Sequence, residues 1–205
     1  MISPDLSFEK KLWKAGFALV AGLDEAGRGA WAGPVAAGAV ILPVDASIIK
    51  TLAGVRDSKQ MTSRQRALWA EEIKTAARAW GVGMASNEEI DSMGILPATR
   101  LAMRRALEQL GCYPDQLLVD AVHLPEISIP QKALIKGDVH VLSIAAASVL
   151  AKTARDALMV ALDAQYPGYG LAHHKGYGTA FHRAALKQLG ACEIHRKSFR
   201  PIKEL

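Results

Sequence analysis

Four acidic residues stand where the sequence predicts the end of a buried strand or the approach to a helix. Asp24 and Glu25 follow an apolar run directly, Asp120 closes another, and Asp138 comes shortly before a helix pattern that begins at Ser143. A carboxylate taken out of water is costly unless solvent or a cation compensates its charge. If these four meet at one end of a sheet, they provide the hard oxygen ligands that Mg²⁺ and Mn²⁺ prefer.

Carboxylates held in this way can support phosphodiester hydrolysis. Two divalent ions about 3.5–4 Å apart activate a water molecule and stabilise the leaving oxygen. The structural alternative is that each acidic residue is a turn or cap residue, which is the commoner role of a single Asp at a strand end. The segment 26–33 favours the catalytic interpretation, because it is rich in glycine and its N–H groups can approach phosphate or sugar.

The composition is that of an ordinary globular protein. Its 205 residues suffice for one domain, half of them are hydrophobic, and the net charge of +5 suits a polyanionic partner without requiring one. The N-terminus lacks a signal-peptide pattern, and no apolar run is long enough to span a bilayer. Cys112 and Cys192 have no zinc-site spacing and predict reduced thiols. We therefore expect a cytoplasmic, monomeric protein without membrane association.

The hydrophobic pattern predicts strands that alternate with helices. Strand patterns cover 17–23, 34–42, 81–86 and 116–120, and the glycine-rich segment joins the first two. Helices are predicted over 8–13, from 62 or 63 to about 80, from 87 onward, and over 94–110, 143–165 and 179–189. This alternation is typical of an α/β domain with helices packed on a central sheet, and the all-helical C-terminal third can lie as a flap beside that sheet.

The segment from Gly22 to Gly29, GLDEAGRG, continued by Gly33-Pro34-Val35, resembles the signature of the bacterial-type ribonuclease HII family. Further blocks resemble this family in the same order, at 57–59, 119–120, 136–138 leading into 143–152, 174–179 and 194–199. The resemblance therefore extends over nearly the whole chain, from about residue 17 to residue 199.

This resemblance implies a single RNase H-like catalytic domain over residues 1–205, with a mixed central sheet flanked by helices and a C-terminal helical flap of roughly 40 residues. It implies an endonuclease that hydrolyses the RNA strand of RNA–DNA hybrids, including single ribonucleotides embedded in duplex DNA, and leaves 5′-phosphate and 3′-hydroxyl ends. The family's catalytic carboxylates, which ligate two Mg²⁺ or Mn²⁺ ions, correspond to Asp24, Glu25, Asp120 and Asp138.

The resemblance also implies substrate-binding residues. Gly27, Arg28 and Gly29 are expected at the ribose 2′-hydroxyl, which a glycine backbone can approach because it has no Cβ. Tyr177 resembles the family's tyrosine, which stacks on the sugar of the nucleotide after the ribonucleotide. Phosphate contacts are expected from Lys59, Ser143, Ser148, Lys152 and Lys175, although Ser148 equally fits a packing role. Asp156, in mid-helix, is expected in an ion pair rather than at the metal.

A few residues depart from the family pattern or invite another assignment. Ala121 follows the third carboxylate where the family usually has glycine, and it fits without strain only if its φ is negative. Met61 replaces a common leucine, which is a mild change in a core. His173, His174 and His182 lie close in sequence but lack the Cys or carboxylate partners of a zinc site.

Two alternatives remain open from the sequence. Ribonuclease HIII has the same fold but normally carries an extra N-terminal domain, for which the short lead before Asp24 leaves no room. A non-catalytic nucleic-acid-binding module would fit the basic balance of the chain. Four intact carboxylates argue against that module, because without metal they repel phosphate.

Overall fold

The computed structural model describes residues 3–204. It contains one mixed five-stranded sheet with the strand order β3-β2-β1-β4-β5. The strands are β1 (Val20–Ala26), β2 (Val35–Ile41), β3 (Ala79–Ala85), β4 (Gln116–Asp120) and β5 (Gln131–Leu134). β2 is antiparallel to both β1 and β3, whereas β4 is parallel to both β1 and β5. The two most apolar strands, β1 and β2, are therefore central, which is where a strand buried on both faces belongs.

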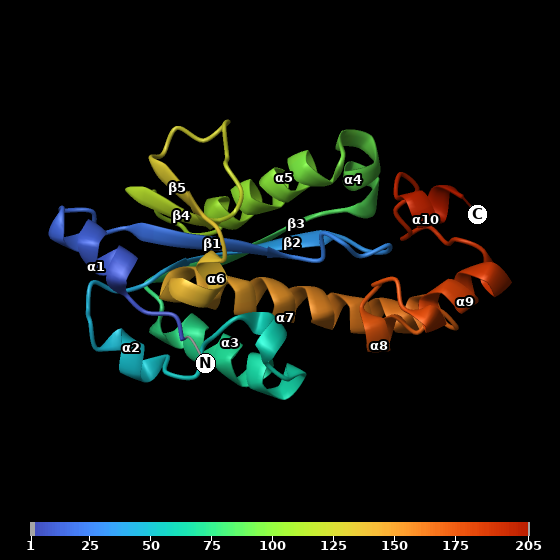
Figure 1. Cartoon of the computed structure of the whole chain (residues 1–205), viewed down its shortest axis with the longest axis horizontal. Coiled ribbons are helices and arrows are strands. Elements are labelled where there is room, and N and C mark those ends of the chain that lie inside the picture. Colours follow the sequence, from blue (N-terminus) through green and yellow to red (C-terminus); the bar gives the residue numbers. More distant parts are fainter. Residues whose placement is uncertain (1–2, 205) are drawn as a thin grey trace.

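Helices cover both faces of this sheet (Figure 1). They are α1 (Ser7–Lys14), α2 (Ile48–Thr51), α3 (Ser63–Ala76), α4 (Asn87–Met93), α5 (Ile95–Glu108), α6 (Gly137–His140), α7 (Leu142–Gln165), α8 (Leu171–His174), α9 (Ala180–Leu189) and α10 (Arg200–Lys203), with a 3₁₀ turn η1 (Ser58–Gln60). α5 packs on one face, against β2 and β3, and α7 packs on the other face with α3 beside it.

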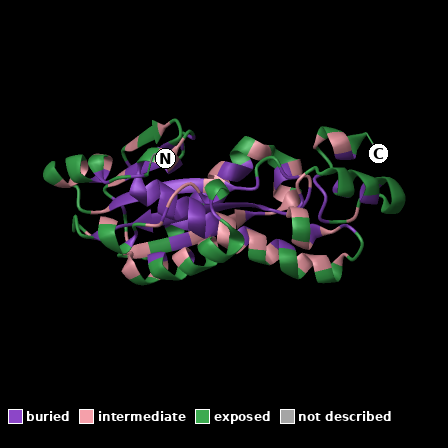
Figure 2. Ribbon diagram, turned by 60° about the horizontal axis from the view of Figure 1, so that its bottom comes forward, coloured by how far each residue is buried: buried purple, intermediate pink, exposed green. Residues whose placement is uncertain are grey.

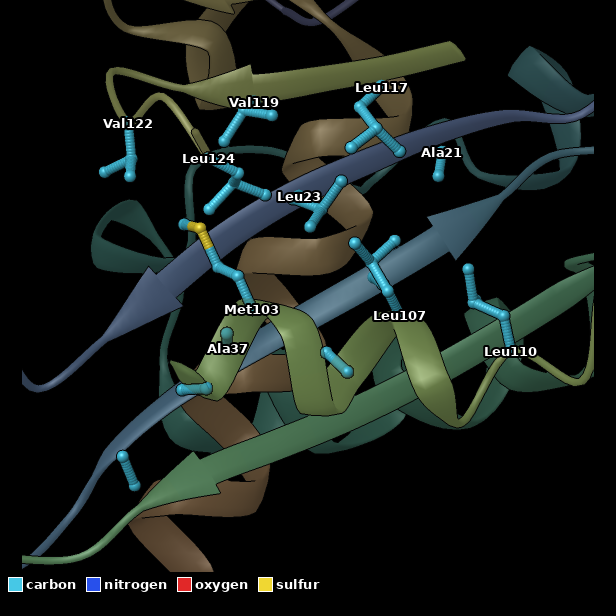
Figure 3. Packing of buried hydrophobic residues seen from close by; sticks show 14 of the residues in the cluster. Ala21, Leu23, Ala37, Met103, Leu107, Leu110, Leu117, Val119, Val122 and Leu124 are labelled. Atoms are coloured by element: carbon cyan, nitrogen blue, oxygen red, sulfur yellow. The ribbon is translucent and has the colours of Figure 1, made fainter. Parts of the chain in front are cut away.

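Each face of the sheet contributes its own apolar core. Figure 3 shows side chains of β1 and β4 meeting those of α5, among them Leu23, Leu117 and Met103. The second core joins Val40 of β2 to the alanine-rich part of α7 and to Ile73 of α3. Buried residues accordingly gather in the middle of the molecule and exposed ones on the outer helices (Figure 2).

Two glycines let α7 cross the sheet at close range. A Cβ on Gly22 of β1 would lie 2.3 Å from the carbonyl carbon of Ser143, and one on Gly38 of β2 would lie 2.3 Å from the carbonyl oxygen of Ala147. A side chain at either position would collide with helix backbone, which cannot easily move. This close packing holds α7 in a defined position beside the end of β1 that carries Asp24.

The C-terminal elements pack on the far end of α7. A third cluster joins Met159 of α7 to Leu171 of α8 and Leu186 of α9, and it includes Ala32 from the segment after β1. An isolated β-bridge between Ala32 and His195 adds a backbone link. The helical nature predicted for this part of the chain is confirmed, while its description as a flap stays a prediction.

The structure confirms the α/β class and changes some predicted boundaries. β1 continues past the apolar run because pairing with β2 extends as far as Ala26 opposite Ala36, so Asp24 and Glu25 lie inside the strand. The helix predicted to about residue 80 ends at Ala76, because residues 79–85 pair with β2. The strand β5 and the short helices α2, α6, α8 and α10 were not predicted.

Within residues 3–204, no helix combines the length and the hydropathy needed to cross a membrane.

Candidate active site

Three of the predicted carboxylates converge at one edge of the sheet. Ligand oxygens of Asp24, Asp120 and Asp138 all lie within 4.8 Å of one another. Because β1 and β4 are parallel, with Leu23 opposite Val119, the next residues on the two strands, Asp24 and Asp120, lie side by side. Asp138 reaches them from α6, the first helix after β5.

The backbone around α6 contributes to this arrangement. The N–H of Gly137 donates a hydrogen bond of 2.7 Å to Oδ1 of Asp120, which joins the start of α6 to the end of β4. A Cβ on Gly137 would lie 2.6 Å from Cδ1 of Ile144, so a larger residue would disturb this contact. The position of Asp138 therefore depends on the short turn that precedes it.

Glu25 lies beside the cluster but outside the group of three. Its Oε1 accepts a hydrogen bond of 3.2 Å from the guanidinium of Arg28. The structure thus brings three of the four predicted ligands together and places the fourth next to them, in an ion pair with a residue of the glycine-rich loop.

The cluster carries more negative charge than its surroundings compensate. Oδ2 of Asp24 and Oε2 of Glu25 are buried without a hydrogen-bond partner. Burial raises the pKa of Asp24 well above its usual range, and the charges of Glu25 and Asp120 raise it further. Burial also raises the pKa of Glu25 and that of Asp120. Lys59 has its Nζ 3.5 Å from Oδ2 of Asp138, and its side chain is largely exposed.

These donors fit a divalent cation. All are carboxylate oxygens, which are the ligands that Mg²⁺ and Mn²⁺ prefer. Unpaired buried carboxylate oxygens are costly, and a bound cation would offset both their desolvation and their mutual repulsion. The residues present are therefore suited to hold such ions.

The glycine-rich loop after β1 leaves backbone groups free beside the carboxylates. Gly27 has a φ of +93°, and a Cβ there would lie 2.0 Å from Nε of Arg155, so the fold requires glycine at this position. Gly29 differs, because an added Cβ would meet no atom within 4 Å. The N–H groups of Arg28 and Gly29 donate to no acceptor among residues 3–204. They are available to a ligand.

A cleft of about 250 Å³ joins this loop to cationic and aromatic side chains. It is lined by Glu25, Ala26, Gly27, Arg28, Gly29, Ser58, Lys59, Lys152 and Tyr177. The ring of Tyr177 lies 5.3 Å from Nζ of Lys152 and 5.5 Å from the guanidinium of Arg155. The structure thus places Lys59, Lys152 and Tyr177 on the same cleft as the glycine-rich loop.

The other residues predicted to contact phosphate do not line this cleft. Ser143 is fully buried at the start of α7, where its N–H donates to Glu9. Ser148 is also buried, and its hydroxyl is 2.8 Å from that of Ser58. Both hydroxyls are buried in this structure, and the phosphate contacts predicted for these two serines stay predictions. Lys175 is half-buried and lines a separate hollow beside α3 and α7.

Ala121 has a positive φ, which is the conformation that was expected to be strained for a residue with a Cβ. Its φ is +50°, a left-handed conformation that costs an L-residue with a Cβ about 1–2 kcal/mol. Its N–H nevertheless donates to the carbonyl of Leu134, so the connection from β4 remains paired with β5. Met61, the other departure, is buried in the core beside α3, as expected of a mild core change.

Sequence reasoning missed two buried arginines behind the loop. Arg196 donates to the carbonyls of Gly27 and Arg28 at 2.8 Å each, and Arg155 donates to the carbonyl of Pro34 at 2.8 Å. One signal was available: Arg155 occurs between Ser148 and Met159 on the buried stripe of α7, where a charge demands partners.

A carboxylate cluster at the ends of parallel strands, next to a cationic cleft with free backbone N–H groups, is typical of nucleases with the RNase H-like fold. The comparisons agree with this class. A family model described as Ribonuclease HII matches residues 21–202. The ribonuclease HII of Dehalococcoides mccartyi is 52% identical over 204 residues, covering 100% of this chain and 96% of the relative.

Two further similarities support the same assignment. The ribonuclease HII of Chloroflexus aurantiacus is 54% identical over 202 residues, covering 98% of this chain and 95% of that protein. The crystal structure of ribonuclease H2 from Pyrococcus horikoshii superposes with a TM-score of 0.74 at 26% identity, covering 90% of this chain and 95% of that one.

The chain belongs to the ribonuclease HII family, whose members are ribonuclease H enzymes. This membership sets aside both alternatives that the sequence had left open, ribonuclease HIII and a non-catalytic binding module.

Proposed function

We propose that this enzyme hydrolyses the RNA strand of RNA–DNA hybrids and also cuts at single ribonucleotides embedded in duplex DNA, leaving 5′-phosphate and 3′-hydroxyl ends. The observation that carries the proposal is the meeting of Asp24, Asp120 and Asp138 beside a cleft whose loop N–H groups are free. Such a cleft can bind a sugar next to a site of phosphodiester hydrolysis.

In this proposal the metal ligands are Asp24, Glu25, Asp120 and Asp138. The unpartnered oxygens of Asp24 and Glu25 support it, because they offer coordination that no protein group uses. Two Mg²⁺ or Mn²⁺ ions bound there would supply a water of lowered pKa and charge neutralisation at the leaving 3′-oxygen. The contribution of the chain is to hold the carboxylates close together within a largely buried site.

The cleft residues recognise the ribonucleotide. The N–H groups of Arg28 and Gly29 can donate to the 2′-hydroxyl, the group that distinguishes RNA from DNA. The absence of a side chain at Gly29 leaves the space that a sugar needs. The ring of Tyr177 packs on the adjacent sugar, on the same cleft. These groups together select the cut site without reading a base.

Phosphates are bound by lysines around the cleft. Lys59 and Lys152 contact the backbone close to the cut, and Lys175 contacts it further along, which positions the duplex without reading its sequence. The enzyme acts as a monomer in this proposal. The free thiols of Cys112 and Cys192 support a reducing, cytoplasmic location.

The test uses a DNA duplex with one ribonucleotide and an all-DNA duplex of the same sequence. We expect one cut, on the 5′ side of the ribonucleotide, with Mg²⁺ or Mn²⁺ and none with excess EDTA. Asp24→Asn should lower the rate about 1000-fold, roughly 4 kcal/mol of lost transition-state stabilisation. Gly29→Ala should lower it about tenfold with an unchanged unfolding midpoint, because only the substrate uses that space.

The all-DNA duplex is the substrate control, and thermal unfolding of each variant is the folding control. Cleavage that persists in EDTA, or near-normal turnover of Asp24→Asn, would remove the metal site from the proposal. Normal cleavage by Gly29→Ala would remove the loop from 2′-hydroxyl recognition and leave the nuclease assignment intact.

A further inference from the structure

Asp156 joins two cations that come from different helices. Its Oδ1 lies 2.7 Å from Nζ of Lys152, one turn earlier on α7, and its Oδ2 lies 3.0 Å from NH2 of Arg66 on α3. The side chains of Lys152, Arg66 and Asp156 are 17%, 12% and 13% exposed. Ion pairs shielded from solvent to this degree are more ordered than pairs on an open surface.

Arg66 carries this connection onward to the loop that presents Lys59. Its NH1 donates to the carbonyls of Ser58 and Met61, which stand on either side of Lys59 and Gln60. The η1 turn is thus attached to α3 through a guanidinium that Asp156 also binds. Fixing Arg66 fixes the backbone from which Lys59 extends.

Lys152 depends on Asp156 more directly. A free lysine side chain samples many rotamers, and ordering it costs up to about 2 kcal/mol. The ion pair with Asp156 orders this side chain before substrate binds, and it keeps the ammonium 5.3 Å from the ring of Tyr177. The lysine is held on the wall of the cleft rather than extended into solvent.

We propose that Asp156 is a positioning residue for substrate binding: one carboxylate orients Lys152 directly and Lys59 through Arg66, so that two phosphate-binding lysines face the same cleft. This inference rests on the proposed function, since it assigns those lysines to the nucleic-acid backbone. Asp156 is outside the metal cluster, in which Asp24, Asp120 and Asp138 are the residues grouped.

Charge and position predict opposite effects at this site. A carboxylate near a polyanion weakens binding by repulsion, so removing it should tighten binding if charge alone matters. If Asp156 positions the lysines, removing it should weaken binding although the cleft becomes more positive. The sign of the change in KM therefore separates the two roles.

The experiment compares the wild-type enzyme with Asp156→Asn on an RNA–DNA hybrid at fixed metal and salt concentrations. We expect KM to rise about tenfold while kcat stays within about threefold, because the carboxylates that support the chemistry are untouched. A KM that is unchanged or lower would overturn the proposal. If the wild-type enzyme does not cleave the hybrid, the proposed function fails instead.

Glu108→Gln is the matched control. Glu108 pairs with Arg104 on α5, across the sheet from α7, and its loss changes the net charge by the same amount. Its KM should remain at the wild-type value or fall slightly. A KM raised as much as in Asp156→Asn would contradict a local positioning role.

Asp156→Glu decides the question if the Asn variant does not fold. It keeps the charge and both ion pairs within reach, so its KM should return to within about threefold of wild type. A folded Glu variant with a KM raised tenfold or more would mean that the carboxylate does not act by holding these cations, and the proposal would be wrong.

Discussion

Two groups of buried charge lie on either side of the glycine-rich loop, and they are built in opposite ways. On one side the carboxylates of Asp24 and Asp138 are almost entirely buried, and on the other side the guanidiniums of Arg155 and Arg196 are fully buried. The anionic group retains oxygens without partners, at Asp24 and Glu25. The cationic group is surrounded by backbone carbonyl oxygens.

Every guanidinium nitrogen of both arginines donates to at least one backbone carbonyl. Arg155 donates to the carbonyls of Pro34, Lys175 and Ala32. Arg196 donates to the carbonyls of Gly33, Arg28, Gly27 and Pro34. Burial and the nearby charge of Arg155 lower the pKa of Arg196 to about 9, which leaves it charged at neutral pH.

The difference separates architecture from function. A buried charge whose nitrogens all donate to carbonyls of the chain has its desolvation compensated and needs no ligand. A buried charge left partly unsatisfied is stabilised only when something else binds. The arginines hold the loop in place, and the carboxylates are the part of the molecule prepared for a ligand.

The largest effect on stability should come from the cationic group. Arg196→Met removes a donor from four buried carbonyl oxygens, and among residues 3–204 those of Arg28 and Gly33 then have no other donor, so we expect the free energy of unfolding to fall by about 3–5 kcal/mol. Asp24→Asn, measured in EDTA, should instead raise the stability, because it removes a buried charge that repels its neighbours. Denaturant unfolding of both variants measures whether each substitution lowers or raises the free energy of unfolding.

Lys197→Met is the control for Arg196, because Lys197 is the exposed neighbour and should change stability by less than about 0.5 kcal/mol. If Arg196→Met lost no more free energy of unfolding than this control, the hydrogen bonds from Arg196 to the four carbonyls would not stabilise the fold. If Asp24→Asn were strongly destabilising without metal, the carboxylates would also belong to the architecture.

An intermediate effect concerns pH, because the buried histidines of the C-terminal part and the carboxylates should change the free energy of unfolding in opposite directions as pH falls. Burial lowers the pKa of His182 from 6.5 to about 4, so between these values the unfolded chain binds more protons than the folded one. Stability is therefore lost as pH falls through this window, by about 3 kcal/mol for His182 when complete. The lowered pKa values of His174 and His195 act in the same direction.

The carboxylates oppose this loss. Because the pKa values of Asp24, Glu25 and Asp120 are raised in the folded chain, folding takes up protons at these sites as pH falls, which adds stability. Asp24→Asn removes one such contribution, so in EDTA it should lose more stability than wild type between pH 7 and about pH 4.5. Parallel curves for the two proteins would mean that Asp24 does not titrate in this range.

The smallest effect is expected at Ala121, directly after one of the carboxylates. Ala121→Gly should raise the free energy of unfolding by about 0.5–1 kcal/mol, because relief of the left-handed strain exceeds the added flexibility of glycine. Ala133→Gly, on the edge strand β5 with ordinary backbone geometry, should lower it by a similar amount. A destabilised Ala121→Gly would show that the methyl group there makes a contact that offsets its strain.

The sequence predicts the group of carboxylates better than the pair of buried arginines, for a physical reason. Asp24 and Asp120 interrupt apolar strand patterns, and a charge at such a point is visible in the linear sequence. Once two parallel strands are predicted, the meeting of their ends follows. The pairing of Leu23 with Val119, which places these residues side by side, is a property of the register and required the structure.

Arg196 and β5 were beyond such reasoning. Arg196 is stabilised by carbonyls from distant segments, and no local pattern distinguishes it from an exposed arginine. Residues 131–134 form an edge strand with no fully buried position, so they lack the apolar alternation that predicts strands. The contact of Ser143 with Glu9 could not be predicted for the same reason, because the proximity of Glu9 arises only in the folded chain.

The hydrogen bonds from Arg196 to these carbonyls also have a consequence for how the chain folds during its synthesis. The bond from Arg196 to the carbonyl of Gly27 spans 169 residues, and that to Arg28 spans 168. Because a domain generally folds as a unit, the loop reaches its final conformation only when residue 196 has been synthesised. The glycine-rich loop therefore gains its contacts with Arg196 only after nearly all of the chain has been synthesised.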